Sequence, residues 1–583
     1  MIKKYSSYKT NSFFTLKTPH PERSRLKILQ IIFFVLCGVI IARLGSLQIL
    51  EHSWYKNLAT QNHEFYQKLF PQRGEIFITD PYSQDNWHKV VANQDLSVVY
   101  ANPWSIENKE DAAQKLAPYL NLTPEETVKK LEPQMLENNR KDTYEVLKKK
   151  IASYEKKAIQ DLNIKGIGFT EEEWRYYPDK EYTAHITGFL GISDQDKVGQ
   201  YGLEGYDNDN LTGTQGYLHS EKVEEAKDGE NLYLTIDKNV QFFACDALKV
   251  HVEKHGAKEG TIIIMQPQTG AIIASCSYPA YDPNDYSAVD SPNVYIDKAL
   301  VQYEPGSVFK AFAMGAALDM GKISPYTTYN DTGEVYVAGW SKPIKNSDGK
   351  GYGIVDMSYA LAQSLNTGAI FAVQQVGNEA WYNYVRKLGY GEKTSIELAG
   401  ENKGDISSLE KFKDIYSATS SFGQGITVTP LQLITAYATI ANGGKLMKPY
   451  IVAERVRANG YKEITQPQVV REVFSPQTAQ TLSAMLVNVV DTGHTAQKAQ
   501  INGYFVAGKT GTAQIVLPNG EYDMNRHKDT FVGFAPASNP QFIMLAKIDE
   551  PQDVSWAEGS VVPLWREVGK YLVNYYQIPP DRE

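Results

Sequence analysis

A serine and a lysine three residues apart, Ser307 and Lys310, have the types and the spacing of a nucleophile and its base. The preceding Glu304-Pro305-Gly306 predicts a loop, and VFKAFAMGAALDM predicts a helix that begins after the serine. Both side chains would share one face of its first turn, where helix amides favour negative charge. The same spacing also occurs at Ser6/Lys9, Ser24/Lys27, Ser53/Lys56 and Ser408/Lys411. The pair alone is therefore weak evidence, and a capping serine followed by a surface lysine is the simpler interpretation.

Two further motifs change that interpretation. Ser364-Leu365-Asn366 lies in the segment QSLNTG, and Lys509-Thr510-Gly511-Thr512 lies on a predicted strand. Ser-x-x-Lys, Ser-x-Asn and Lys-Thr-Gly in this order are typical of penicillin-binding proteins and class A β-lactamases. We expect Gly511 to let a substrate backbone approach the strand closely.

The segments around these motifs predict one antiparallel sheet covered by helices. From about residue 229, NLYLTI and GTIIIM are strand-like, QPQTG is a turn, and AIIASC is a returning strand. Helical patterns such as PLQLITAYATIANGG occupy the middle of the chain. Strands return at GYFVAGKTGTAQIVL, TFVGFAP and QFIMLAKI, with a turn at Pro518-Asn519-Gly520, and PLWREVGKYLVNYY predicts a last amphipathic helix.

The segment before these motifs, from residue 51 to 228, predicts a mixed α+β domain. EIFIT and VVYAN have the composition of short strands. EVLKKKIASYEKKAIQDL predicts a charged helix whose lysines face solvent.

Residues 28–50, ILQIIFFVLCGVIIARLGSLQIL, predict an uncleaved single-pass membrane anchor. The run from Ile31 to Ala42 carries no charge, and a helix rising about 1.5 Å per residue over the whole segment is long enough to cross a bilayer. The basic residues before it are Lys3, Lys4, Lys9, Lys17, Arg23, Arg25 and Lys27. Because Glu22 is the one acid there, residues 1–27 are expected in the cytoplasm. A cleaved signal peptide is disfavoured, since IIARLGSLQ offers no clean pair of small residues.

Composition narrows the class of protein. The 583 residues exceed one ordinary core of about 150 residues, and 42% hydrophobic with 22% charged residues is typical of globular domains. Lys and Arg total 59 against 68 Asp and Glu, a net charge of −9 that argues against a nucleic-acid binder. Of the three cysteines, Cys37 lies in the apolar run, so one disulfide at most is expected and a Cys-rich metal centre is excluded.

Over its whole length the sequence resembles a class B penicillin-binding protein, a membrane-anchored D,D-transpeptidase of peptidoglycan synthesis. The segments that carry the resemblance are Arg73-Gly74, RYYP leading into AHITGFLG, GLEGYDNDNLTGTQG, YPAYDPN, EPGSVFK, FGQGITVTPLQL, AGKTGTAQ and FVGFAP. The RYYP-to-TGFLG stretch and the lack of appended C-terminal domains are most similar to the division-type (septal, FtsI-like) branch.

The resemblance implies an α+β architecture in four parts. These are a cytoplasmic tail (1–27), a transmembrane anchor (28–50), an elongated pedestal of the dimerisation type (51–228), and a transpeptidase domain (229–583). The last would have the penicillin-binding/β-lactamase-like fold, an antiparallel sheet with helices on both sides.

The resemblance also implies the roles of the first two motifs. Ser307 would be acylated by the penultimate D-alanine of a donor stem peptide, with Lys310 as its base. Ser364 would relay a proton to the leaving amine, and Asn366 would fix the lysine and the substrate backbone. An amine of a neighbouring stem peptide would then attack the acyl-enzyme, whereas penicillin would mimic the donor and remain attached.

The third motif would bind the donor. By resemblance, Thr510 and Thr512, with Gly511 between them, hold its terminal carboxylate, and the amides of Ser307 and Thr512 form the oxyanion hole. Lys509 is the candidate for a second cation near Lys310.

Lys310 can act as a base only as a neutral amine. Moving its pKa from about 10.4 to near 7 requires roughly 4–5 kcal/mol of differential destabilisation. Burial and the positive charge of Lys509 would both act in that direction.

Two other functions stay open at this point. A membrane-anchored serine β-lactamase would share the motifs but needs a glutamate base for hydrolysis; Glu379 has a superficially suitable place, although a helix-face glutamate is favoured. A scaffold that binds β-lactams without turnover is disfavoured by the complete set of motif residues.

Signals for cofactors are weaker. His251 and His255 could share a helix face and hold zinc, but the glutamate between them does not fit HExxH and a surface helix is favoured. We expect no metal, nucleotide or other cofactor.

By resemblance, the expected partners are stem peptides, β-lactam inhibitors, a SEDS-family glycosyltransferase, other division proteins and the bacterial plasma membrane.

Overall fold

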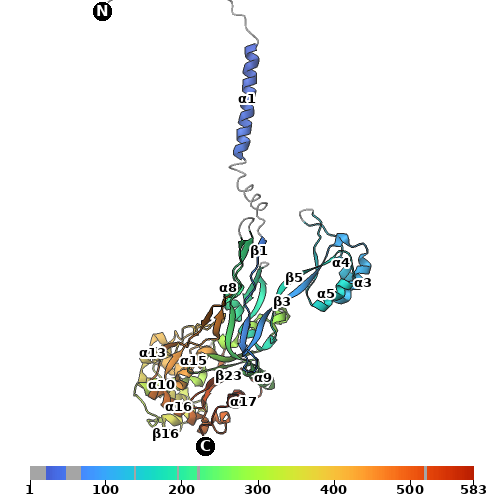
Figure 1. Ribbon diagram of the computed structural model, residues 1–583. Helices are drawn as coiled ribbons and strands as arrows, with labels where there is room; N and C mark the ends of the chain where they lie inside the picture. Colours follow the sequence, from blue (N-terminus) through green and yellow to red (C-terminus); the bar gives the residue numbers. More distant parts are fainter. Residues whose placement is uncertain (1–21, 47–66, 137–139, 194–195, 219–222, 518–520) are drawn as a thin grey trace, which may run out of the picture. The chain divides into compact units, whose positions relative to one another are not determined.

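The computed structural model describes residues 22–46, 67–136, 140–193, 196–218, 223–517 and 521–583 (Figure 1). The expected turn at Pro518-Asn519-Gly520 lies outside these residues. The chain divides into two compact units, one of Met1–Phe70 with Gln215–Ala226, the other of Pro71–Thr214 with Lys227–Glu583.

The described residues of the first unit form a long helix and a small sheet. Its elements are α1 (Glu22–Gly45), β1 (Gln67–Leu69), β8 (Gly216–Leu218) and β9 (Val223–Glu224). β8 pairs antiparallel with both β1 and β9. Apolar side chains of α1 are exposed, as in Phe34 at 70%. In the described part of the chain, no helix combines the length and the apolar character needed to span a membrane. The expected anchor at 28–50 falls partly on α1, and residues 47–50 lie outside the description.

The second unit contains a seven-stranded mixed sheet in the order β19-β18-β10-β2-β3-β4, with β5 paired to β3. Its strands are β2 (Ile76–Thr79), β3 (Trp87–Ala101), β4 (Glu145–Ile151), β5 (Ile167–Tyr176), β10 (Asn231–Asp237), β18 (Val452–Val456) and β19 (Lys462–Ile464). β10 pairs in parallel with β2 and antiparallel with β18. Strands on either side of the expected boundary near 229 therefore share one sheet.

Three helices with their own apolar cluster pack near β3 and β4, namely α3 (Lys109–Leu120), α4 (Pro124–Lys130) and α5 (Ser153–Asp161). The prediction of one charged helix over EVLKKKIASYEKKAIQDL is wrong for its first half, because EVLKKKI forms β4. β4 pairs with β3 and buries Leu147 and Ile151. Tertiary pairing thus overrides a local pattern that favours helix.

A buried ion cluster joins three of the segments that carry the family resemblance. Arg175 Nε donates to Glu204 Oε1 at 2.6 Å, and Arg73 Nε donates to Glu204 Oε2 at 2.8 Å. Arg175 also donates to the Gly74 carbonyl oxygen at 2.6 Å. Burial raises the pKa of Glu204, but the two guanidinium charges outweigh burial and hold that pKa below its ordinary value.

The motifs lie around a five-stranded antiparallel sheet in the order β12-β11-β23-β22-β21. Its strands are β11 (Glu259–Met265), β12 (Ile272–Tyr278), β21 (Ala507–Val516), β22 (Tyr522–Ala535) and β23 (Phe542–Asp549). The surrounding helices are α9 (Lys238–Lys254), α10 (Lys310–Asp319), α11 (Met357–Ala362), α12 (Asn366–Val376), α13 (Asn378–Lys387), α14 (Asp414–Ser421), α15 (Pro430–Ala441), α16 (Pro476–Thr492) and α17 (Val561–Tyr575). In Figure 1, α9 and α17 lie on one side of β23, and α10 and α15 on the other. The expected α+β class, with an antiparallel sheet between helices, is confirmed.

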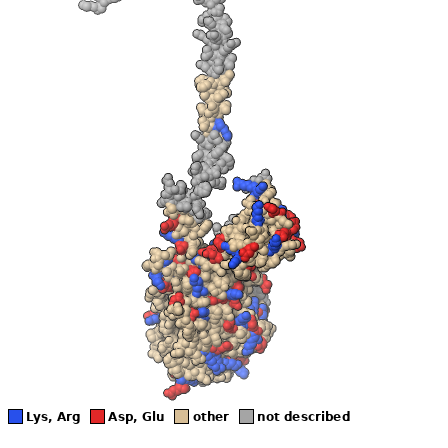
Figure 2. Space-filling view, turned by 45° about the vertical axis from the view of Figure 1, so that its right-hand side comes forward, with Lys and Arg blue, Asp and Glu red and all other residues tan. Residues whose placement is uncertain are grey.

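Short elements complete the second unit. They are α6 (Ala184–Thr187), α7 (Gly202–Tyr206), α8 (Asn208–Thr212) and the paired strands β6 (Phe189–Ser193) with β7 (Asp196–Gln200), β13 (Thr328–Asp331) with β16 (Gly353–Asp356), β14 (Glu334–Val335) with β15 (Ile344–Lys345), and β17 (Lys445–Met447) with β20 (Val469–Glu472). Acidic and basic side chains are interspersed over the face of this unit that Figure 2 shows.

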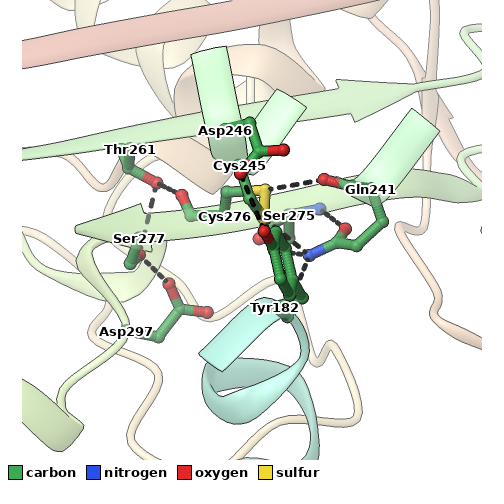
Figure 3. The surroundings of a disulfide bond; sticks show 9 residues. All are labelled: Tyr182, Gln241, Cys245, Asp246, Thr261, Ser275, Cys276, Ser277 and Asp297. Atoms are coloured by element: carbon green, nitrogen blue, oxygen red, sulfur yellow. Dashed lines mark hydrogen bonds between the residues drawn. A yellow bond between two sulfur atoms is a disulfide. The ribbon is translucent and has the colours of Figure 1, made fainter. Parts of the chain in front are cut away.

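A disulfide between Cys245 and Cys276 ties α9 to β12 (Figure 3). Beside it, the side-chain amide of the buried Gln241 donates to the Ser275 carbonyl oxygen at 2.8 Å and accepts from the Ser275 amide at 2.9 Å. The helix is thus fixed to the sheet by one covalent bond and by a paired hydrogen bond to a strand backbone.

Candidate active site

The structure brings the three motifs together at the hydroxyl group of Ser364. Lys310 Nζ lies 3.1 Å from Ser364 Oγ and 2.5 Å from the Ser364 carbonyl oxygen. Lys509 Nζ lies 3.0 Å from the same Oγ atom. The hydroxyl group is therefore within hydrogen-bond distance of both amines and can pass a proton between them.

The backbone turn between α11 and α12 positions Ser364. Its φ of 58° is in the left-handed region, which costs a non-glycine residue about 1–2 kcal/mol. The following Leu365 is buried, which anchors the turn. Strain of this kind in a polar residue is typical of functional sites.

Both lysines are almost completely buried, Lys310 at 1% and Lys509 at 0% exposure. Burial, and next the positive charge of Lys509, hold the pKa of Lys310 well below its ordinary value. Burial lowers the pKa of Lys509 to about 7. Both effects favour the neutral form of the Lys310 amine, which the expected base requires.

Ser307 lies one turn before Lys310. The α-helix α10 begins at Lys310, and Ser307 belongs to a preceding 3-10 turn, Gly306–Phe309, rather than to the first α-helical turn that the sequence predicted. Ser307 is half-buried, and no described residue forms a hydrogen bond with its hydroxyl group. The hydroxyl is therefore not engaged within the described chain, while Lys310 is oriented by Ser364.

Gly511 lies against the loop that precedes Ser307. A Cβ atom at this position would lie 2.8 Å from the Pro305 carbonyl oxygen and 3.3 Å from the Val308 amide nitrogen. The glycine therefore lets β21 approach the loop that carries Ser307. Gly423, in the FGQG segment, approaches the same loop from another side, since a Cβ there would lie 2.2 Å from the Gly306 carbonyl oxygen.

The other motif side chains make contacts that the sequence did not predict. Asn366 Nδ2 donates to the Lys345 carbonyl oxygen at 2.7 Å, so the structure does not bring this amide to Lys310. Thr510 Oγ1 bonds to Thr495 Oγ1 at 2.8 Å. Thr512 Oγ1 accepts from the Ala557 amide at 3.2 Å, which leaves its hydroxyl hydrogen free to be donated.

Strand β21 lies at the edge of its sheet. Within the described sheet it pairs with β22 alone, so its other edge can add an extended peptide by main-chain hydrogen bonds. The 3-10 turn with Ser307 contacts this strand, because the position of a Cβ on Gly306 is 3.4 Å from the Thr512 carbonyl oxygen. A peptide added to β21 would therefore run past Ser307.

Sequence reasoning missed one acidic group near Ser307. Glu304 Oε1 accepts from the Gly425 amide at 2.9 Å, and the Tyr522 hydroxyl lies 3.2 Å from Glu304 Oε2. Its sequence signal is an acid directly before Pro305-Gly306-Ser307, to which the loop prediction assigns no function.

The two histidines considered for zinc and the glutamate considered as a hydrolytic base lie in ordinary surroundings. His251 Nε2 lies 3.0 Å from Glu567 Oε2, and His255 Nδ1 lies 2.8 Å from Asp553 Oδ1. Glu379 is exposed in the first turn of α13, as a helix-face residue.

Known proteins are similar to this chain in both sequence and fold. Residues 260–567 match the penicillin binding protein transpeptidase domain, and residues 68–234 match the penicillin-binding protein dimerisation domain. Stage V sporulation protein D of Bacillus subtilis is 31% identical over 563 residues, which cover 91% of this chain and 83% of that protein. The probable peptidoglycan D,D-transpeptidase PbpC of Pseudomonas aeruginosa is 30% identical over 575 residues, covering 95% of this chain and 96% of that protein.

Among solved structures, penicillin binding protein 2X from Streptococcus thermophilus matches with a TM-score of 0.73 at 22% identity. The match covers 87% of this chain and 80% of that chain. At this identity the likeness shows a common fold.

Proposed function

The chain belongs to the penicillin-binding protein transpeptidase family, and we propose that it cross-links peptidoglycan stem peptides as a class B D,D-transpeptidase with Ser307 as nucleophile. The observation that carries the proposal is the Ser364 hydroxyl group between Lys310 Nζ and Lys509 Nζ, one turn from Ser307.

Acylation begins with the neutral Lys310 amine taking the proton of Ser307. The Ser307 oxygen attacks the carbonyl carbon of the penultimate D-alanine, and the tetrahedral oxyanion is held by backbone amides of Ser307 and Thr512. Ser364 then passes a proton to the departing nitrogen. The terminal D-alanine leaves, and the donor remains as an ester on Ser307.

Deacylation reverses the proton path. An amine of a second stem peptide attacks the ester, the new amide bond forms, and Ser307 regains its proton through Lys310 and Ser364. In penicillin the scissile amide is part of a ring, so the leaving nitrogen stays tethered and the acyl-enzyme persists.

The donor site combines an extended edge with a positive charge. β21 supplies main-chain pairing and Lys509 a positive charge, and Thr512 supplies a hydroxyl hydrogen for the donor carboxylate. The Thr510 hydroxyl group donates to Thr495 Oγ1, and rotation of that hydroxyl group would let Thr510 donate to the donor carboxylate instead.

The membrane location is part of the same proposal. We place α1 in the plasma membrane as the anchor, with the N-terminus in the cytoplasm, on the strength of its uncharged run and its exposed apolar side chains. The Cys245–Cys276 disulfide supports an extracytoplasmic catalytic domain, since disulfides persist in oxidising compartments. Retention of the full chain in membranes after an alkaline wash would support the anchor, and its release would contradict it.

The domain boundaries and the protein partners remain proposals of the same kind. The pedestal is placed at 51–228 and the transpeptidase domain at 229–583. A SEDS-family glycosyltransferase and other division proteins are proposed partners, on the family resemblance alone.

Intact-protein mass spectrometry after penicillin addition, followed over hours beside Ser307→Ala, tests the function. A long-lived adduct that the variant lacks is expected. An adduct that decays with turnover of the drug would indicate a β-lactamase. An unmodified protein would contradict an active nucleophile at Ser307.

A further inference from the structure

The carboxylate of Glu304 is held beside the nucleophile loop but has no part in the reaction described above. It accepts a hydrogen bond from the backbone amide of Gly425. Two residues earlier in the chain, Gly423 lies in close contact with Gly306. The carboxylate also accepts from the Tyr522 hydroxyl group at the start of β22. Two separate segments of the chain therefore fix this side chain.

Glu304 lacks the counter-ion that a carboxylate in its position normally has. Its side chain is half-buried, and no lysine, arginine or histidine of the described residues forms an ion pair with it. Burial raises its pKa, and the hydrogen bonds from Gly425 and Tyr522 only partly oppose this. Buried acidic groups are normally paired with a cation. Among the described residues the Glu304 carboxylate thus has no cationic partner, and it keeps lone pairs that could accept further hydrogen bonds.

Glu304 lies close to Ser307 along the chain. Three peptide units separate Glu304 from Ser307, so their Cα atoms lie at most about 11 Å apart. The intervening loop is held by the bond from the Gly306 amide to the Gly423 carbonyl oxygen, at 3.2 Å. An acceptor amine that gives a proton to Glu304 would therefore have only a short distance to move to an acyl group on Ser307.

We propose that Glu304, oriented by Tyr522 and Gly425, binds the ammonium group of the acceptor stem peptide. This inference rests on the proposed function and adds the site of the second substrate. The ligand class is a primary amine, because a protonated amine supplies both the charge and the hydrogen-bond donors that the carboxylate lacks.

The site also accounts for a proton that must be removed. The acceptor arrives as an ammonium ion with three N–H protons, but only the neutral amine is a nucleophile. Glu304 takes one proton and later releases it to water. A second proton passes through Lys310 and Ser364 to Ser307 as the ester C–O bond breaks, and the third remains on the new amide nitrogen.

Partitioning of one acyl-enzyme among three acceptors tests the proposal. The detergent-solubilised full chain is given a synthetic thioester donor that ends in a carboxylate, with D-alaninamide, methanol and water as competing acceptors. In Glu304→Gln the amide-to-acid product ratio should fall about tenfold or more, as expected for loss of a charge-assisted hydrogen bond. The ester-to-acid ratio from methanol, which carries no charge, should not change.

Two comparisons separate the acceptor role from a structural one. Tyr522→Phe keeps the carboxylate and should lower the amide-to-acid ratio less than Glu304→Gln does. Glu410→Gln removes an exposed glutamate that also accepts from a tyrosine, Tyr382, at 3.4 Å, and should leave the ratio unchanged.

Each remaining result counts against the acceptor site. An unchanged amide-to-acid ratio in Glu304→Gln would overturn it. So would an equal fall in penicillin acylation or in the methanol ratio, because Glu304 would then merely support the nucleophile loop. Absence of an adduct at Ser307 in the unmodified chain would instead overturn the proposed function, which is a distinct result.

Discussion

Gly511 and Pro305 approach so closely that a Cβ atom on residue 511 would lie 2.8 Å from the Pro305 carbonyl oxygen. The strand that is to bind the donor and the loop that carries Ser307 are therefore in direct backbone contact. The two backbones can lie this close because residue 511 has no Cβ atom. A side chain at residue 511 would therefore move Ser307 relative to a bound donor.

Gly511→Ala should slow acylation by penicillin about 100-fold, since a displacement of about 1 Å can cost that much. The second-order rate of adduct formation measures it, with the thermal unfolding midpoint recorded alongside. Gly38→Ala is the matched control, because a Cβ there meets nothing within 4 Å. Wild-type acylation in Gly511→Ala would show that the contact has no part in positioning Ser307.

Lys310→Arg should reduce acylation by about 10²–10⁴-fold, the usual contribution of a general base. The guanidinium group keeps the positive charge but remains protonated at any working pH, so it cannot accept the Ser307 proton. Stopped-flow acylation with a fluorescent penicillin provides the rate. If Lys310→Arg kept the wild-type rate, another group would have to be the base.

The acylation rate should rise with pH to a plateau, and the midpoint of the rise should lie well below the ordinary lysine pKa of about 10.4. The pKa of Lys310 is lowered by burial and then by the charge of Lys509, so its amine is neutral above a depressed midpoint. Lys509→Met removes that charge and should move the midpoint to higher pH, whatever its effect on the maximal rate. A midpoint that stays in place or moves down would contradict the coupling of the two amines.

Arg175→Ala should lower the free energy of unfolding by about 3–5 kcal/mol, because it leaves Glu204 buried with only one of its two guanidinium partners. Urea unfolding at neutral pH measures this. Lys115→Ala, which removes an exposed pair with Asp111, should cost less than about 1 kcal/mol.

The pH dependence has a definite sign. The pKa of Glu204 is lowered in the folded chain, so its contribution is complete above the unfolded value of about 4.3 and is lost as pH falls through the folded value. The stability difference between the chain and Arg175→Ala should therefore narrow at acidic pH. A constant difference from neutral to acidic pH would show that Glu204 does not titrate as described.

The sequence predicted most of what depends on local pattern. The hairpin of β11 and β12, helix α15, and strands β21 and β23 follow from periodicity and turn residues, and the three motifs contain Lys310, Ser364 and Lys509, which lie together in the structure. Their convergence on one hydroxyl group could only be inferred from family resemblance, because the residues come from distant parts of the chain.

What the sequence did not predict depends on long-range contacts. EVLKKKI forms a strand because β3 provides a strand for it to pair with. A side chain at residue 511 would collide with the Pro305 carbonyl oxygen, which lies about two hundred residues earlier in the chain. The Asn366 amide is directed to Lys345, and Glu304 acquires its surroundings from Gly425 and Tyr522, which no local pattern reveals.

The pairing of β10 with β2 has a consequence for the evolution of this chain. Leu232 lies opposite Ile76 and Tyr233 opposite Phe77, so strands on either side of residue 229 must fit each other side chain by side chain. A genetic crossover near that residue would join a β2 from one parent to a β10 from another and disturb this match. The two parts are therefore expected to be inherited together, as one recombination block, even where a domain boundary is drawn between them.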